Sequence, residues 1–148
     1  MARDMPLKVA FDRHRSLPVL DTEFATLWCY REVGIVHHRI KRLASEQGDE
    51  LRALLQAGLD QLVQNDCRGW LSDNREGGRM RPEIEAWAKT VWQPQAIRAG
   101  WRTWAIVLPE LTVSQLNMQR FAQDYSANGI ETSLFSDPDR AMEWLLER

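Results

Sequence analysis

Strand-like runs alternate with amphipathic helical segments along most of this 148-residue chain, and this alternation limits the fold more than any other feature. The clearest helical segment spans residues 49–64. Apolar residues recur there at the i, i+3, i+4, i+7 spacing of one helix face, namely Leu51, Leu54, Leu55, Gly58, Leu59, Leu62 and Val63. Strands separated by whole helices pair in parallel. The sequence therefore predicts an α/β domain with a mixed, mostly parallel sheet and about four helices.

The predicted strands lie at residues 17–20, 25–32, 35–40, 68–72, 103–108 and 130–135. The second and third are rich in β-branched and aromatic residues, and the Val33-Gly34 pair between them fits a hairpin turn. Pro18 cannot donate to a central ladder, so the first strand is expected at the edge of the sheet. We predict a single domain over residues 17–148, preceded by a loose tail over residues 1–16.

Prolines and glycines mark the ends of the later helices. Pro82 suits the first turn of a second helix, and Gly100 suits its C-terminal cap. Pro94 should kink or restart this helix because it lacks an N–H group. The apolar stripe of this helix is predicted to comprise Ile84, Trp87, Ala88, Val91 and Trp92.

Two further helices are predicted near the end of the chain. Ser114 can cap the third helix, which would bury Met118, Phe121, Ala122 and Tyr125 and stop at Asn128-Gly129. Asp137-Pro138 opens the fourth helix as an N-cap residue followed by proline. Its apolar side consists of Ala141, Met142, Trp144 and Leu145.

Composition excludes several classes of function. The formal net charge is −2 with acidic and basic residues interspersed, which argues against a nucleic-acid partner. No apolar run approaches the roughly 18 residues that span a bilayer, and the first residues do not form a signal peptide. Cys29 and Cys67 fit small buried residues in a reducing compartment. We therefore expect a cytoplasmic protein without a membrane span.

The order of elements resembles the STAS domain found in sulfate-transporter tails and anti-sigma-factor antagonists. The likeness rests on residues 70–75 (WLSDNR), 104–109 (WAIVLP) and 135–145 (FSDPDRAMEWL), which are similar to a group of small bacterial STAS-like proteins. The resemblance implies a regulatory or protein-interaction role. STAS antagonists carry a phosphorylatable Ser or Thr in the loop after the middle strand, whereas residues 73–82 here contain neither. The usual phosphorylation switch is therefore not expected.

Polar residues at the carboxyl ends of the predicted parallel strands form the candidate ligand-binding rim. These residues are Asp73, Asn74, Arg75, Glu110 and Asp137. Ligands of open α/β sheets bind beyond these strand ends, so the rim is predicted to form one polar depression. Each residue also has a simpler explanation, with Asp137 as a helix cap, Asp73 as a turn former and Glu110 as a solvated charge.

No catalytic constellation can be assembled from the sequence. His37 and His38 are adjacent on a strand, so they face opposite sides of the sheet and cannot share a metal. His38 shares its face with Val36 and Ile40 and fits a satisfied, half-buried histidine. Gly77-Gly78 lacks the lysine and hydroxyl of a phosphate-binding loop. We predict no catalytic residues, no metal and no cofactor.

Five of the seven tryptophans lie between residues 70 and 104. Trp70, Trp87 and Trp104 are predicted to be core residues. Trp101 follows the cap Gly100 and is predicted to pack back on the last turn of the helix. Trp92 lies about a quarter-turn off the centre of the stripe, counted from Ile84 at 100° per residue. It is therefore predicted to be partly exposed, on a surface open to a protein partner or a second copy of the chain. The simpler alternative is a tryptophan that lies flat over the edge of the core.

Three functional hypotheses follow. The first is a non-enzymatic regulatory or protein-interaction module of STAS-like fold. The second is a small-ligand or lipid-binding domain of the same fold, because the concentrated aromatic residues can line an apolar pocket. The third is a hydrolase or transferase that uses the carboxylates Asp73, Glu110 and Asp137 at the strand ends.

Overall fold

The computed structural model describes residue 11 and residues 14–41, 48–77, 81–115 and 128–148. Its strands are β1 (Leu17–Asp21), β2 (Ala25–Tyr30), β3 (Ile35–Ile40), β4 (Gly69–Asp73), β5 (Thr103–Val107) and β6 (Glu131–Phe135). Its helices are α2 (Gly48–Gln64), α3 (Pro82–Trp87), α4 (Gln93–Ala99), α5 (Glu110–Gln115) and α7 (Pro138–Leu146), with a π turn at Ala88–Trp92 between α3 and α4.

The six strands form one mixed sheet in the order β1-β2-β3-β4-β5-β6. The first three strands are antiparallel, and β3 to β6 run parallel. This arrangement confirms the predicted α/β class, the edge position of β1 and the hairpin between β2 and β3. The parallel register places Trp70 opposite both Val36 and Trp104, so these three side chains share one face of the sheet.

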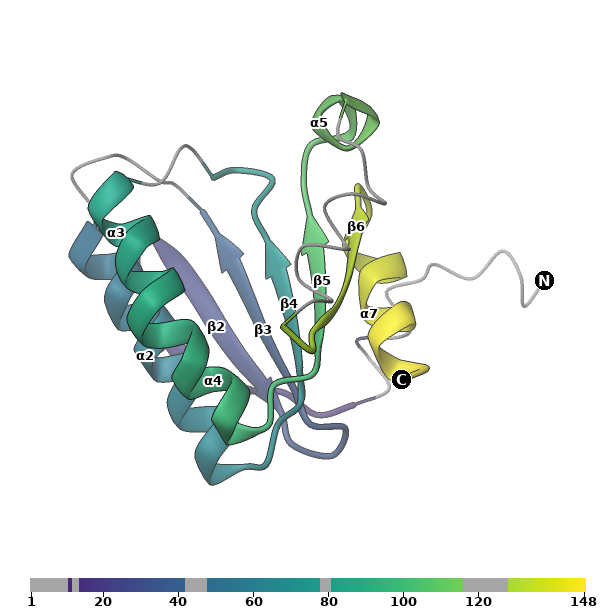
Figure 1. Cartoon of the computed structure of the whole chain (residues 1–148). Coiled ribbons are helices and arrows are strands. Elements are labelled where there is room, and N and C mark those ends of the chain that lie inside the picture. Colours follow the sequence, from purple (N-terminus) through teal and green to yellow (C-terminus); the bar gives the residue numbers. More distant parts are fainter. Residues whose placement is uncertain (1–10, 12–13, 42–47, 78–80, 116–127) are drawn as a thin grey trace.

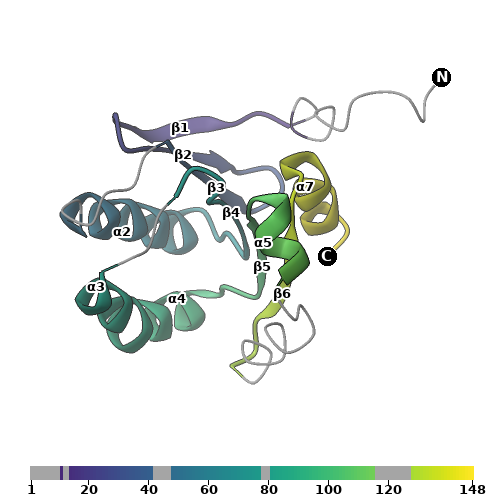
Figure 2. The ribbon, with the colours of Figure 1, turned by 90° about the horizontal axis from the view of Figure 1, so that it is seen from above.

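Helices cover both faces of the sheet (Figures 1 and 2). Helices α2, α3 and α4 lie against one face, where they form the larger of the two hydrophobic clusters with Trp70, Trp92 and Trp101. Helix α7 lies on the opposite face and buries Met142 against β4 and β5. Helix α5 sits beyond the carboxyl end of β5 (Figure 1). The sheet is thus the middle layer of three.

The predicted stripe of α2 is buried except at its last member. Leu51, Leu54, Leu55, Gly58, Leu59 and Leu62 are buried, whereas Val63 is 65% exposed. Twelve residues at 100° each turn Val63 by about 120° from Leu51, which takes it off the face that meets the sheet. Gly58 allows α2 to pass close to β4, because a Cβ atom there would overlap the indole ring of Trp70.

The helix that begins at Pro82 changes its winding before Pro94. The N–H of Gln93 donates to the carbonyl of Ala88, an i→i−5 bond. Pro94 lacks an N–H group, and in a regular α-helix its ring would clash with the carbonyl group four residues earlier. Both effects favour the wider π turn. The predicted kink or restart at Pro94 therefore takes the form of a π turn followed by α4, which ends at Gly100 with a φ of 117°.

The π turn exchanges the positions of Val91 and Trp92. A π turn contains more residues than an α turn, so each residue advances by less than 100°. Val91 is consequently 45% exposed, and Trp92 is only 6% exposed. The predicted place of Val91 in the apolar stripe and the predicted partial exposure of Trp92 are both wrong. The expected surface around Trp92 is in fact part of the interior.

The four other tryptophans between residues 70 and 104 differ in how deeply they are buried. Trp70 and Trp101 are buried, whereas Trp87 and Trp104 are half-buried against the same hydrophobic cluster. Asp137 caps α7 as predicted, accepting a hydrogen bond from the N–H of Asp139.

The segment after β5 departs from its prediction. Helix α5 begins at Glu110, four residues before the predicted cap at Ser114. Met118, Phe121, Ala122 and Tyr125 lie outside the described residues, as does most of the predicted tail. Phe11 is described, and its ring lies 5.2 Å from that of His37, so this residue packs on the sheet.

Candidate functional site

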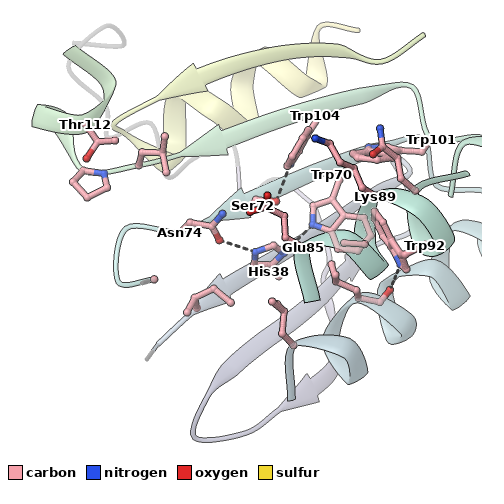
Figure 3. Close-up of a pocket in the computed structure, with 18 residues that line it drawn as sticks. His38, Trp70, Ser72, Asn74, Glu85, Lys89, Trp92, Trp101, Trp104 and Thr112 are labelled. Atoms are coloured by element: carbon pink, nitrogen blue, oxygen red, sulfur yellow. Dashed lines mark hydrogen bonds between the residues drawn. The ribbon is translucent and has the colours of Figure 1, made fainter. Parts of the chain in front are cut away.

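A pocket of about 570 Å³ lies between the sheet and the helices of the larger cluster (Figure 3). Its described lining comes from β3, β4 and β5, from α2, and from the α3–α4 helix around the π turn. Leu108, Pro109 and Thr112 extend the lining to the carboxyl end of β5. The pocket therefore opens where ligands of α/β sheets usually bind.

Four tryptophans form a continuous wall of this pocket. Trp70 and Trp92 meet edge to face with ring centroids 5.3 Å apart, and both contact Trp101. Trp101 in turn meets Trp104 at 5.4 Å. Aromatic pairs at these separations are favourable, so each ring of the wall is supported by its neighbours.

The four indole N–H groups donate to acceptors within the protein. Trp92 Nε1 donates to the carbonyl of Leu55 at 2.8 Å, and Trp101 Nε1 donates to the carbonyl of Thr103 at 3.0 Å. The other two donate to pocket side chains at 2.9 Å, Trp70 to His38 Nδ1 and Trp104 to Ser72 Oγ. A molecule in the pocket therefore meets the apolar rings of this wall.

His38 is held in one neutral tautomer. An indole N–H can only donate, so Nδ1 of His38 must accept from Trp70 and carries no proton. Nε2 then carries the proton and donates to Oδ1 of Asn74 at 2.9 Å. Burial lowers the pKa of His38 to about 4, which agrees with a ring that stays neutral near pH 7. The prediction of a satisfied histidine is confirmed, although the side chain is fully rather than half buried.

Asn74 is positioned by its backbone as well as by His38. Its N–H donates to the carbonyl of Val107 at 2.9 Å, and its own carbonyl accepts from the N–H of Gly77 at 3.0 Å. These bonds tie the residue after β4 to the end of β5 and close a turn. The amide of Asn74 is thus fixed at the floor of the pocket (Figure 3).

Only Asn74 of the five predicted rim residues lines the pocket. The side chain of Asp73 is buried and makes a two-pronged pair with Arg75, with Nε–Oδ1 at 2.9 Å and an N–O distance of 2.8 Å to Oδ2. Burial alone would raise the pKa of Asp73, but the hydrogen bonds and charge of Arg75 outweigh it and lower the pKa. Successive strand residues face opposite sides, which separates Asp73 from Ser72 and Asn74.

The remaining two rim residues lie at the starts of two different helices. Glu110 is exposed at the first turn of α5, and Asp137 is occupied as the cap of α7. Asp137 does lie within electrostatic reach of Arg75, whose pKa it helps to raise after the larger effect of Asp73. Among the described residues, no group of three or more His, Cys, Asp or Glu is arranged to hold a metal ion.

His37 faces the side of the sheet opposite to His38, as predicted. Its ring stacks among aromatic residues, with centroid distances of 4.7 Å to Trp28 and 5.2 Å to Phe11. Neither ring nitrogen has a hydrogen-bond partner among the described residues. Burial, helped by the neighbouring His38, lowers the pKa of His37 to about 3.

The two cysteines are buried and free, as predicted for small interior residues. They are 38 positions apart in the sequence, yet their sulfur atoms lie only 3.6 Å apart. Neither lines the pocket. The sequence gives no sign of this closeness, because it arises from the packing of β2 against the segment after α2.

Comparisons with known proteins identify no relative, since no family model, curated protein or solved structure matches the chain. Within the described ranges, none of the helices has the length and apolar character needed to cross a membrane. The geometry of the pocket is therefore the main guide to function.

Proposed function

We propose that this protein is a non-enzymatic binding domain of STAS-like fold whose tryptophan-lined pocket holds one small, largely apolar molecule. The observation that carries the proposal is the pocket itself, about 570 Å³ in volume, walled by four tryptophans and floored by His38, Ser72 and Asn74. Small-molecule sites are concave, mostly apolar and about 300–1,000 Å³ in volume, with a few convergent polar groups.

The state of the polar floor favours binding over catalysis. Both nitrogens of His38 are engaged, and a proton on Nδ1 would break the bond from Trp70. His38 is therefore a poor general base. The Ser72 hydroxyl accepts from Trp104, and it donates to no histidine or carboxylate among the described residues. The carboxylates of the hydrolase hypothesis, Asp73, Glu110 and Asp137, do not line the pocket.

Filling the pocket tests the proposal. Ala88 lines it, whereas Ala86 on the same helix is exposed to solvent. We expect wild-type protein to bind 2-acetylnaphthalene, an apolar probe smaller than the pocket, saturably and with one site in equilibrium dialysis. Ala88→Phe should weaken this binding at least tenfold, because its ring occupies the probe's space. The matched control Ala86→Phe should leave it within twofold of wild type.

Two results would contradict the proposal. One is the absence of saturable binding to the wild-type protein. The other is equal binding by the wild type and Ala88→Phe, which would place the probe elsewhere on the surface. Circular dichroism of both variants checks that each retains the native fold.

A further inference from the structure

We infer that the pocket selects molecules with an uncharged carbonyl group, whose oxygen accepts hydrogen bonds from Asn74 and Ser72. This inference rests on the proposed function and specifies the ligand of the same site. It follows from the direction of the hydrogen bonds in the pocket floor. The N–H group of a tryptophan fixes which atom of the next side chain accepts, and this leaves the other hydrogen-bonding group of that side chain to donate.

The first chain of hydrogen bonds begins at Trp70. Its indole N–H donates to Nδ1 of His38, and Nε2–H of His38 donates to Oδ1 of Asn74. The amide oxygen of Asn74 is therefore on the His38 side, and its NH₂ group points away from the ring. This NH₂ group has no hydrogen-bond acceptor among the described residues. This chain of hydrogen bonds therefore ends at the NH₂ group of Asn74, a residue that lines the pocket.

The second chain begins at Trp104. Its indole N–H donates to Oγ of Ser72 at 2.9 Å, which leaves the hydroxyl hydrogen of Ser72 to be donated elsewhere. Ser72 is 3% exposed, and its hydroxyl hydrogen meets no acceptor among the described residues. Ser72 and Asn74 are two residues apart and face the same side of the sheet (Figure 3).

Both chains thus present hydrogen-bond donors at the apolar pocket floor. A donor that a bound ligand covers without accepting from it loses its hydrogen bond to water, so a ligand oxygen placed there is favoured. Aligned hydrogen bonds also polarise one another, which makes the NH₂ group of Asn74 a stronger donor. A hydrocarbon of the same shape would leave these donors unsatisfied.

The charges at the pocket indicate a neutral rather than an anionic ligand. Glu85 and Lys89 both line its exposed edge, and they are one helical turn apart (Figure 3). Their opposite charges cancel, so they give no net attraction for a carboxylate. The floor itself offers only uncharged donors, and burying an anion against uncharged groups is costly.

Three probes of nearly equal shape test the inference. They are 2-acetylnaphthalene, which carries a ketone, 2-ethylnaphthalene, which lacks an acceptor, and 2-naphthoate, which carries an anion. We expect the ketone to bind wild-type protein at least tenfold more tightly than each of the other two, measured by competition in equilibrium dialysis.

Asn74→Asp provides a matched variant. It retains an oxygen that accepts from Nε2 of His38 but loses the NH₂ donors. We expect the ketone to lose at least tenfold in affinity, while 2-ethylnaphthalene changes by less than threefold. Retained binding of 2-ethylnaphthalene shows that the variant is folded and its pocket intact. If Asn74→Asp does not fold, Asn74→Leu is measured with the same two probes and the same expectation.

The outcomes separate this inference from the proposed function. Equal binding of ketone and hydrocarbon would overturn the carbonyl preference and leave the pocket as an apolar site. Tighter binding of 2-naphthoate would also overturn it and indicate recognition of an anion through Lys89. Failure of all three probes to bind would overturn both the inference and the proposed function.

Discussion

His37 and His38 show how far single residues could be interpreted from the sequence. Strand periodicity places them on opposite faces, and the structure agrees. Their partners could not be predicted, because Trp70 and Asn74 are 32 and 36 positions away from His38. The same periodicity argues against a shared rim, since Asp73 and Asn74 are themselves neighbours that face opposite sides.

Both histidines make stability depend on pH. The pKa is about 3 for His37 and about 4 for His38 in the folded protein, against 6.5 for an unperturbed histidine. The unfolded chain therefore binds two protons as the pH falls below 6.5, and the folded chain binds none until the pH nears 4. The free energy of unfolding should be constant with respect to these groups above pH 6.5 and decrease below it. The slope is roughly 1.4 kcal/mol per pH unit for each histidine.

Urea denaturation between pH 7.5 and pH 5 measures this slope. His37→Phe fits the aromatic neighbours Trp28 and Phe11 and removes one of the two titrating groups. We expect the slope below pH 6 to fall to about half of the wild-type value in this variant. Equal stability of the wild type at pH 7.5 and pH 5 would contradict the account of two neutral, buried rings.

At the scale of elements, the sequence identified segments better than their exposed faces. The stripe of α2 and the Asp137-Pro138 start of α7 are local patterns, and both are confirmed except for Val63 at the end of the stripe. The orientation of Trp92 depends on the π turn, which no periodicity with a fixed angle per residue can represent. Pro94 is the signal that could have found it, because it removes the N–H of a regular helical turn.

Truncation of Val91 and Trp92 tests the π turn directly. Trp92 is buried and hydrogen-bonded to Leu55, so Trp92→Ala should cost about 3–5 kcal/mol of unfolding free energy. Val91 is largely exposed, so Val91→Ala should cost less than about 1 kcal/mol. Chemical denaturation measures both values. The reverse order of the two losses would indicate a regular α-helix with Val91 in its core-facing stripe.

At the scale of the whole molecule, alternation of strands and helices correctly predicts a mixed, mostly parallel sheet. The pocket could not be predicted in the same way, because it depends on which side chains meet across β3, β4 and β5. The clustering of tryptophans between residues 70 and 104 was the available signal. Four of those five residues line the pocket, and the fifth, Trp87, lies outside it with Arg52 over its ring.

The seven tryptophans also supply the most direct test of the proposed binding site. Each indole N–H gives its own signal in a proton–nitrogen correlation spectrum, and single Trp→Phe variants assign the signals. Trp70, Trp92, Trp101 and Trp104 line the pocket, and the other three tryptophans do not.

Titration of ¹⁵N-labelled protein with 2-acetylnaphthalene should shift the signals of these four indoles with one shared saturation curve. The signals of Trp28, Trp87 and Trp144 should stay in place, because these rings lie outside the pocket. Equal shifts at all seven tryptophans, or no shift at the four pocket residues, would contradict the assignment of this pocket as the binding site.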